Sequence, residues 1–289
     1  MVLKKTIRLI VVADKINFVM KSIILIATCF FVLVSCENTN PAFRFSNFKG
    51  TQAESLSRAI ESEDINTIRY EVIQKKVNVN SEDKKYETSL LELAITNYKK
   101  EAFEELLKLG ADPNIENFQC ESVLISAIRY NDNCDLYFVK RLLENGAEIN
   151  PRFFEKCNYF SDEPICETIK WYNDDCDIEC GYKILKLLTS KLNDTKILSQ
   201  YNNSKDYQQN IVYNCLSTGQ NIRALKYLIV DLKYEVPEEI YIDGTVLFDY
   251  DYGFKDFKEI LEHEEFIFED LDREKAKNDI LSYLENNNK

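Results

Sequence analysis

The sequence is poor in the residues that form tight turns, with 7 glycines and 5 prolines among 289 residues. An all-β fold needs many such turns, so this composition favours helices joined by short connections. Histidine is scarcer still, because His263 is the only one in the chain. Any Ser-His or Cys-His nucleophile must therefore use His263, which lies among glutamates at the end of an expected helix and is typical of a solvated histidine.

The familiar signatures of catalysis and metal binding are also missing from the sequence. It has no Gly-rich phosphate loop and no Gly-x-Ser-x-Gly elbow. The acidic run 249–253 comes nearest to a calcium loop but has no terminal glutamate. Cys176 and Cys180 have three residues between them and no second ligand pair, which is too little for a zinc site. We therefore expect a protein that is not an enzyme and binds no cofactor and no metal ion.

Positive charge is in deficit, since 36 Lys and Arg face 49 Asp and Glu, for a net charge of −13. The first 36 residues hold five of the basic side chains, and without them the net charge is −17. Such a field repels the phosphates of nucleic acid, so we expect no nucleic-acid partner. The excess of acid serves solubility, and its alternative interpretation is a basic protein partner.

A secretory signal is present near the N-terminus. Lys21 precedes an apolar run over residues 23–34, which is too short to span a bilayer comfortably. The following Leu33-Val34-Ser35-Cys36 resembles a bacterial lipobox, which implies a signal peptide over residues 1–36 and lipidation of Cys36. Residues 1–19 suit an over-extended gene start, with Met20 as the alternative initiator. Because Glu37 rather than Asp follows Cys36, the resemblance implies a bacterial cell-envelope protein, lipid-anchored preferentially in the outer membrane, facing the periplasm or the exterior.

Residues 37–50 show no helical period and contain Pro41 and Gly50, so they are expected to be a tether. Three phenylalanines in this segment, Phe43, Phe45 and Phe48, are more than a linker needs. Part of the tether is therefore expected to dock on the domain that follows, which is predicted to cover residues 51–289.

The chain repeats itself. Residues 106–114 read Leu-Leu-Lys-Leu-Gly-Ala-Asp-Pro-Asn, residues 142–150 read Leu-Leu-Glu-Asn-Gly-Ala-Glu-Ile-Asn, and a weaker copy covers residues 72–80. Upstream, residues 88–95 correspond to residues 121–128, with Ala94 and Ala127 at matching places. These motifs resemble the ankyrin repeat, with its Thr-Pro-Leu-His-x-Ala start and its Leu-Leu-x-x-Gly-Ala-Asp-x-Asn end. The resemblance implies an all-α solenoid of helix-turn-helix units.

An apolar stripe of helical period extends the repeat to the end of the chain. Its paired members are Val72/Ile73, Leu106/Leu107, Leu142/Leu143, Leu187/Leu188, Leu228/Ile229 and Ile260/Leu261, preceded by Ile68, Phe103, Val139, Ile184, Leu225 and Phe257. We assign each pair to the second helix of a unit, which gives five to six units. Residues 51–150 carry the clear repeats and residues 151–289 degenerate ones, with a capping helix over residues 272–286.

Seven cysteines remain after the predicted signal, and an exported chain would oxidise some of them. Cys166 and Cys215 fall on first helices and are expected to be core residues. The repeat register places Cys120 beside Cys157 in neighbouring finger loops, and Cys134 beside Cys176 in neighbouring inter-helix loops. These are the two expected disulfides.

The ankyrin resemblance places binding on the concave surface of finger loops and first helices. In this sequence the finger loops are residues 81–87, 115–120 and 151–162, called fingers 1, 2 and 3 below. Aromatic side chains in loops are typical of binding hot spots. The candidate partner-binding residues are Tyr86, Phe118, Phe153, Tyr159 and Phe160, with Phe153 and Phe154 equally suited to packing inward.

The function we expect is protein binding by a lipid-anchored monomer, as an immunity or inhibitory protein or as a scaffold. The alternative is a host-directed effector, or a small enzyme hidden in the divergent C-terminal region. A stack made of helices alone that continues through residues 211–229 and 257–261 would argue against that enzyme, whereas a separate mixed α/β fold after residue 198 would favour it. The identity of the partner cannot be derived from fold alone.

Overall fold

The computed structural model describes residues 40–131, 134–149, 153–154, 159–160, 164–171, 178–192, 211–217, 221–236, 239–242, 253–263 and 270–287. Two compact units are distinguished, one ending at Arg44 and one running from Phe45 to Lys289. In the first, the 3-10 helix η1 (Pro41–Phe43) begins after Asn40, whose side chain accepts a hydrogen bond from the backbone N–H of Ala42. No helix within these described ranges is both long and apolar enough to cross a membrane.

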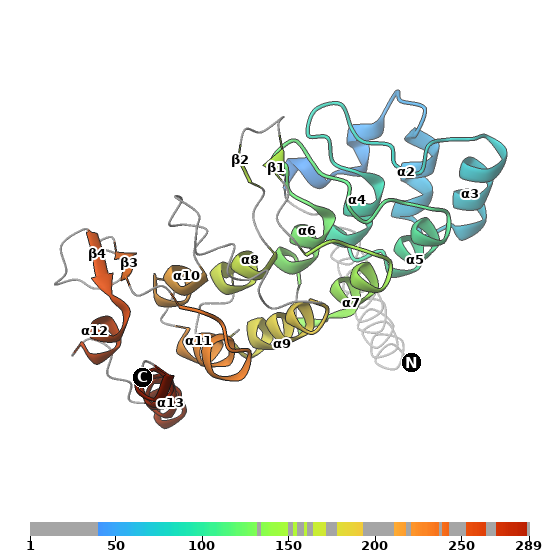
Figure 1. Ribbon diagram of the computed structural model, residues 1–289. Helices are drawn as coiled ribbons and strands as arrows, with labels where there is room; N and C mark the ends of the chain where they lie inside the picture. Colours follow the sequence, from blue (N-terminus) through green and yellow to red (C-terminus); the bar gives the residue numbers. More distant parts are fainter. Residues whose placement is uncertain are drawn as a thin grey trace, which may run out of the picture. The chain divides into compact units, whose positions relative to one another are not determined.

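The second unit consists mainly of helices in consecutive pairs (Figure 1). The first helices are α2 (Glu54–Glu61), α4 (Leu90–Thr96), α6 (Val123–Arg129), α8 (Pro164–Trp171), α10 (Ile211–Ser217) and α12 (Phe257–Glu262). The second helices are α3 (Ile65–Arg69) with η3 (Tyr70–Gln74), α5 (Lys100–Lys108), α7 (Tyr137–Glu144), α9 (Ile178–Thr189), α11 (Ile222–Lys226) with η7 (Tyr227–Asp231), and α13 (Leu271–Asn287).

Each pair packs against the next one along the chain. First helices contact first helices, from α2 through α4, α6 and α8 to α10. Second helices do the same where α3 meets α5, and where α11 meets both α9 and α13. The residues expected to precede each apolar pair are buried throughout: Ile68, Phe103, Val139, Ile184, Leu225 and Phe257. The predicted all-α repeat solenoid is therefore confirmed.

Two short antiparallel hairpins interrupt the helices. Strand β1 (Phe153–Phe154) pairs with β2 (Tyr159–Phe160) inside finger 3. Strand β3 (Glu239–Ile242) pairs with β4 (Gly253–Asp256), which leads directly into α12. The described part of the region after residue 198 thus holds helix pairs and one hairpin. The described part of this region is therefore not made of helices alone, and the alternative of a small enzyme stays a prediction.

The segment predicted to be a tether has local structure where it is described. Residues Phe45–Phe48 form the 3-10 helix η2, which contacts α2. The side chains of Phe45 and Phe48 are 6% and 0% exposed, respectively. Their burial explains why this segment has more aromatic residues than a linker needs, because burying a phenylalanine contributes about 2 kcal/mol.

Serine and glycine mark matching boundaries in the repeats. Ser89 and Ser122 accept hydrogen bonds from the third backbone N–H of α4 and α6 and so act as N-caps. Gly110 and Gly146 follow α5 and α7 with φ of 90°, a left-handed conformation that glycine adopts without a Cβ clash. The backbone N–H of Ala111 then closes on the carbonyl of Leu106 at 2.9 Å, completing the helix end.

Two second helices contain one residue more than their neighbours. Ile68 and the left-handed Lys76 are eight positions apart, whereas Phe103 and Gly110 are seven. The extra residue is absorbed by the π-turn η3, and η7 does the same after Leu225. Glu71 therefore occupies the buried place of Leu106, and it is held there by Ser55 and Lys75 at 2.7 and 2.9 Å.

The predicted core of the first repeat is partly wrong. The sequence aligned Val72 and Ile73 with the leucine pairs, but Ile73 is 45% exposed and Val72 is only half-buried. Ile68, Val72 and Ile73 stand at i, i+4 and i+5, whereas the other five sets have i, i+3, i+4 spacing. Ile73 therefore falls outside the buried stripe, and Glu71 takes the i+3 place.

The last predicted second helix is also wrong. Ile260 and Leu261 are buried as expected, but their helix α12 follows α11 and is itself followed by α13. Because α13 contacts α11, α13 holds the second-helix position and α12 the first. The stack therefore ends in a complete helix pair, and α13 supplies the cap.

Asparagines at the repeat ends connect neighbouring units. The side-chain carbonyl of Asn80 accepts a hydrogen bond from the backbone N–H of Asp112 at 2.8 Å. Asn114, which occupies the equivalent place in the next unit, accepts one from Glu148 at 2.7 Å and donates to the carbonyl of Gly146 at 3.0 Å. These bonds fix the spacing of successive units.

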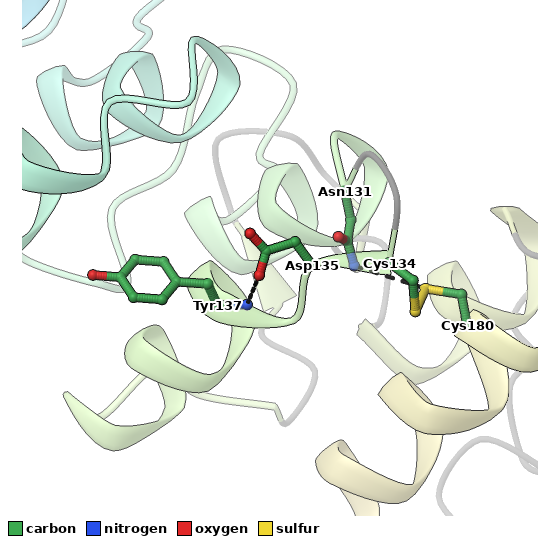
Figure 2. The surroundings of a disulfide bond; sticks show 5 residues. All are labelled: Asn131, Cys134, Asp135, Tyr137 and Cys180. Carbon is green, nitrogen blue, oxygen red and sulfur yellow. Dashed lines mark hydrogen bonds between the residues drawn. A yellow bond between two sulfur atoms is a disulfide. The ribbon is translucent and has the colours of Figure 1, made fainter.

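A disulfide joins Cys134, in the turn before α7, to Cys180 in α9 (Figure 2). Their Cα atoms lie 5.4 Å apart, a normal separation for a disulfide. The predicted disulfide between Cys134 and Cys176 is therefore wrong. A zinc site at Cys176 and Cys180 is also contradicted, because the sulfur of Cys180 is bonded to Cys134. The register placed the correct neighbouring units together, but it missed the partner by about one helical turn, because the start of α9 could not be fixed from the sequence.

The other described cysteines are of two kinds, one disulfide-bonded and one a buried free thiol. Cys120 is also disulfide-bonded, while Cys157, its expected partner, lies outside the described residues. Cys215 is a free thiol that is 0% exposed, so the prediction of a core residue is confirmed, whereas the side chain of Cys166 is outside the described part. Burial raises the pKa of the Cys215 thiol, which keeps it in the unreactive neutral form.

Candidate binding surface

Finger 1 owes its shape to one buried carboxylate. Asp83 is 2% exposed, and its side chain accepts backbone N–H bonds from Lys85, Tyr86 and Thr88 at 2.8, 2.9 and 3.1 Å. An isolated antiparallel bridge between Glu82 and Ser89 closes the loop. These bonds satisfy donors that the tight turn would otherwise leave without partners.

Finger 2 is built in the same way around an amide. The side-chain oxygen of Asn117, which is 4% exposed, accepts the backbone N–H groups of Gln119 and Glu121 at 3.0 and 3.2 Å. A bridge between Glu116 and Ser122 closes this finger. Both finger loops are therefore ordered by a buried polar side chain at equivalent positions.

The two predicted aromatic residues of these fingers lie together. The rings of Tyr86 and Phe118 are 5.9 Å apart and tilted by 58°, within the range of favourable aromatic pairing. The backbone N–H of Phe118 donates to the carbonyl of Tyr86 at 3.2 Å, which ties finger 2 to finger 1. Phe118 is 45% exposed, and the ammonium group of Lys85 lies 4.6 Å from the centre of the Tyr86 ring.

Finger 3 contributes a hairpin whose backbone alone is described. Phe153 is paired with Phe160, and Phe154 with Tyr159. Their side chains lie outside the described part of the structure, so their proposed role in binding stays a prediction. Cys36, the predicted lipidation site, is likewise outside the described residues.

Beneath finger 2 lies a buried acid that the sequence analysis did not single out. Glu92 in α4 is 2% exposed, and its Oε1 atom accepts hydrogen bonds from the side chains of Asn117 at 3.0 Å and Ser126 at 2.6 Å. Burial raises the pKa of the Glu92 carboxyl from 4.5 to about 7 against the opposite effect of hydrogen bonds from Ser126, Asn117 and the backbone of Ser89, and the charge of Glu121 raises it further.

A second buried polar cluster connects the first helices α6 and α8. The guanidinium group of Arg129 forms ion pairs with Glu121 and with Glu167. The side chains of Arg129 and Glu167 are 16% and 2% exposed, so the pair is shielded from water. Such a cluster positions the root of finger 2 relative to the following unit.

These features describe a surface with an exposed aromatic group on an ordered loop. Within the described ranges, no group of His, Cys, Asp or Glu side chains could hold a metal ion. The single histidine, His263, is the C-cap residue of α12. The exposed aromatic ring of Phe118 on a braced loop is instead the kind of group that anchors a protein interface.

The chain matches one curated protein at 25% identity over 201 residues, namely "Putative ankyrin repeat protein R841" of Acanthamoeba polyphaga mimivirus. The similarity is thus to an ankyrin repeat protein. The alignment covers 63% of this chain but only 33% of the relative, so the chain spans about a third of that protein's length.

The chain was also compared with solved structures and with protein-family models. Among solved structures, the human ASB11 ankyrin repeat domain aligns with a TM-score of 0.41 and 19% identity, covering 62% of this chain and 69% of that domain. No protein-family model matches the chain.

Proposed function

We propose that this chain is a non-enzymatic module that binds another protein through fingers 1 and 2, as an immunity or inhibitory protein or as a scaffold. The observation that carries the proposal is the pair Tyr86 and Phe118, because a ring that is 45% exposed lies on a loop held by buried hydrogen bonds. A preorganised loop loses little conformational entropy on binding. The similarity to an ankyrin repeat protein supports the same function.

The charge of the chain favours a basic partner. Without its first 36 residues the chain has a net charge of −17, which accelerates association with a positively charged protein. An immunity protein that neutralises a basic toxin or exported enzyme meets this requirement, as does a scaffold for a basic envelope protein. Steering of this kind weakens as salt screens the charges, so association should slow at high ionic strength.

Binding through the fingers predicts that Tyr86→Ala/Phe118→Ala weakens the partner complex by about 30-fold or more, since aromatic hot spots contribute about 2 kcal/mol or more. The partner is first identified by a photocrosslinking amino acid placed at Gln119, next to Phe118.

Affinity is then measured by calorimetry with the purified partner. Tyr70→Ala is the control, because Tyr70 is 53% exposed and lies in η3, away from the fingers. Equal affinity of the finger variant and the native protein would rule out this interface.

We further propose that lipid at Cys36 anchors the protein in the bacterial envelope. The sequence Leu33-Val34-Ser35-Cys36 after an apolar run supports this proposal. Oxidised Cys120 and the Cys134–Cys180 disulfide also suit an exported chain, because disulfides persist mainly in oxidising compartments.

Cys36→Ser is expected to move the protein from the membrane fraction to the soluble fraction, because the acyl chains are the proposed attachment. Fractionation of cells and mass analysis of the N-terminal peptide would measure this. Cys29→Ser changes a cysteine of the predicted signal outside the lipobox and should leave fractionation unchanged. Membrane attachment of the Cys36 variant equal to that of the native protein would refute the anchor.

A further inference from the structure

Glu92 connects the core of the repeat stack to the finger that carries Phe118. Its Oε1 atom accepts the amide N–H of Asn117, and the Asn117 carbonyl in turn accepts the backbone N–H groups of Gln119 and Glu121. A change at the Glu92 carboxyl is therefore transmitted through the side chain of Asn117 to the backbone that follows Phe118. The loop of finger 1 is held differently, because its hydrogen bonds converge on Asp83; Ser89, which closes this finger, bonds Glu92 at the start of α4.

The surroundings of Glu92 suit its neutral form better than its charged form. Both side-chain donors reach Oε1, and the backbone N–H of Ser89 also donates to the carboxyl. Elements α2, α5 and α6 pack against α4. The charged group acting on Glu92 is the carboxylate of Glu121, whose partner Arg129 is shared with Glu167 of α8. An ionised Glu92 is thus buried beside another acid, with only neutral donors to replace its hydration, which is unfavourable.

We propose that the protonation of Glu92 controls how firmly finger 2 is held on α4, and through it the presentation of Phe118. When the carboxyl is neutral, finger 2 is closed over it. When the carboxyl is ionised, opening of finger 2 lets water reach the charge and lowers its energy. The link to binding rests on the proposed function, but the opening of the loop does not.

The direction of the pH effect follows from the two pKa values. In the closed state the pKa of Glu92 is about 7, and in the open, hydrated state it returns toward 4.5. A pKa raised in the closed state means that closure is most stable below pH 4.5 and weakens as pH rises through 7. The open fraction should increase on the order of 50-fold between pH 5 and pH 8.

Amide hydrogen exchange, corrected for the intrinsic pH dependence, measures this opening without any partner. The protection factors of the Gln119 and Glu121 amides should fall on the order of 50-fold from pH 5 to pH 8. The amides of Lys85 and Tyr86 in finger 1 are the internal control and should stay constant. Glu92→Gln should remove the pH dependence in finger 2.

A second variant tests the assignment of the titrating group. Ser126→Ala removes a donor that favours the ionised carboxyl, so the midpoint of the exchange profile should shift to higher pH. An equal pH dependence in Glu92→Gln, or a midpoint near pH 4.5 in the native chain, would overturn the proposal. A loss of binding without this exchange signature would leave the finger interface standing and refute the proton control.

Discussion

Replacement of Arg129 with methionine is expected to lower the free energy of unfolding by about 3–5 kcal/mol, the usual cost of removing one partner from a buried ion pair. Methionine retains the apolar stem but leaves Glu167, at 2% exposed, without its cation. Glu121 loses its partner as well, so two acids in adjacent units remain partly buried. Urea unfolding followed by far-ultraviolet circular dichroism measures the change.

Arg141→Met provides a matched comparison on the surface. Arg141 binds Glu104 through two hydrogen bonds of 2.6 and 2.8 Å, but its side chain is 35% exposed. Exposed pairs contribute about 1 kcal/mol at most, because water screens the charges. Adding Glu167→Gln to Arg129→Met should recover part of the lost stability. If Arg129→Met were no more costly than Arg141→Met, the buried cluster would not stabilise the stack.

Loss of the Cys134–Cys180 disulfide should cost between about 2 and 4 kcal/mol, because the bond closes a loop between cysteines 46 positions apart. The loop includes the segment between the third and fourth units, where the interval between apolar pairs in the sequence is longest. The double variant Cys134→Ser/Cys180→Ala should therefore unfold at a lower urea concentration than the oxidised native chain.

Reduction of both proteins isolates this effect. With a thiol reductant present, the native chain and the double variant both lose the disulfide at Cys120. Their free energies of unfolding should then differ only by the effect of replacing the Cys134 and Cys180 side chains. Thiol labelling confirms which cysteines have become free. If the oxidised native chain and the double variant had the same midpoint, the disulfide would not limit unfolding of the stack.

Much of the architecture is predictable from residues that occur at matching places. The serines at the starts of α4 and α6, and Gly110 and Gly146 after α5 and α7, encode their local conformation directly. The apolar stripe through Phe103 and Val139 identifies the buried face in the same way. These features are local, so the sequence alone is sufficient for them.

The π-turn, the disulfide partner of Cys134 and the position of α12 depend on three-dimensional placement and could not be predicted from the sequence. A π-turn leaves no mark in the composition of residues 70–74, so the extra residue between Ile68 and the left-handed Lys76 could not be foreseen. The partner of Cys134 depends on where α9 begins, and the intervals between repeats no longer fix that point. The position of α12 likewise follows from its contacts and not from its apolar pattern.

The candidate surface was predictable in part. Aromatic residues in finger loops indicated Tyr86 and Phe118, and the structure brings these two together. Glu92 gave one signal that could have been used, since it interrupts the apolar run Leu90 to Ile95 in a helix that is buried on every side. Its hydrogen bond to Asn117 spans 25 positions and requires the folded finger.

The π-turns η3 and η7 have a consequence for how such a chain can evolve. Both absorb a single added residue, and the closing bond from Val77 to Glu71 or from Tyr234 to Leu228 forms across the longer turn at 3.0 Å in each case. One-codon insertions in second helices are thus accommodated inside the unit where they arise, without displacing its neighbours. Lineages carrying this domain can accumulate length differences between repeats while the order of stacked helices is inherited unchanged.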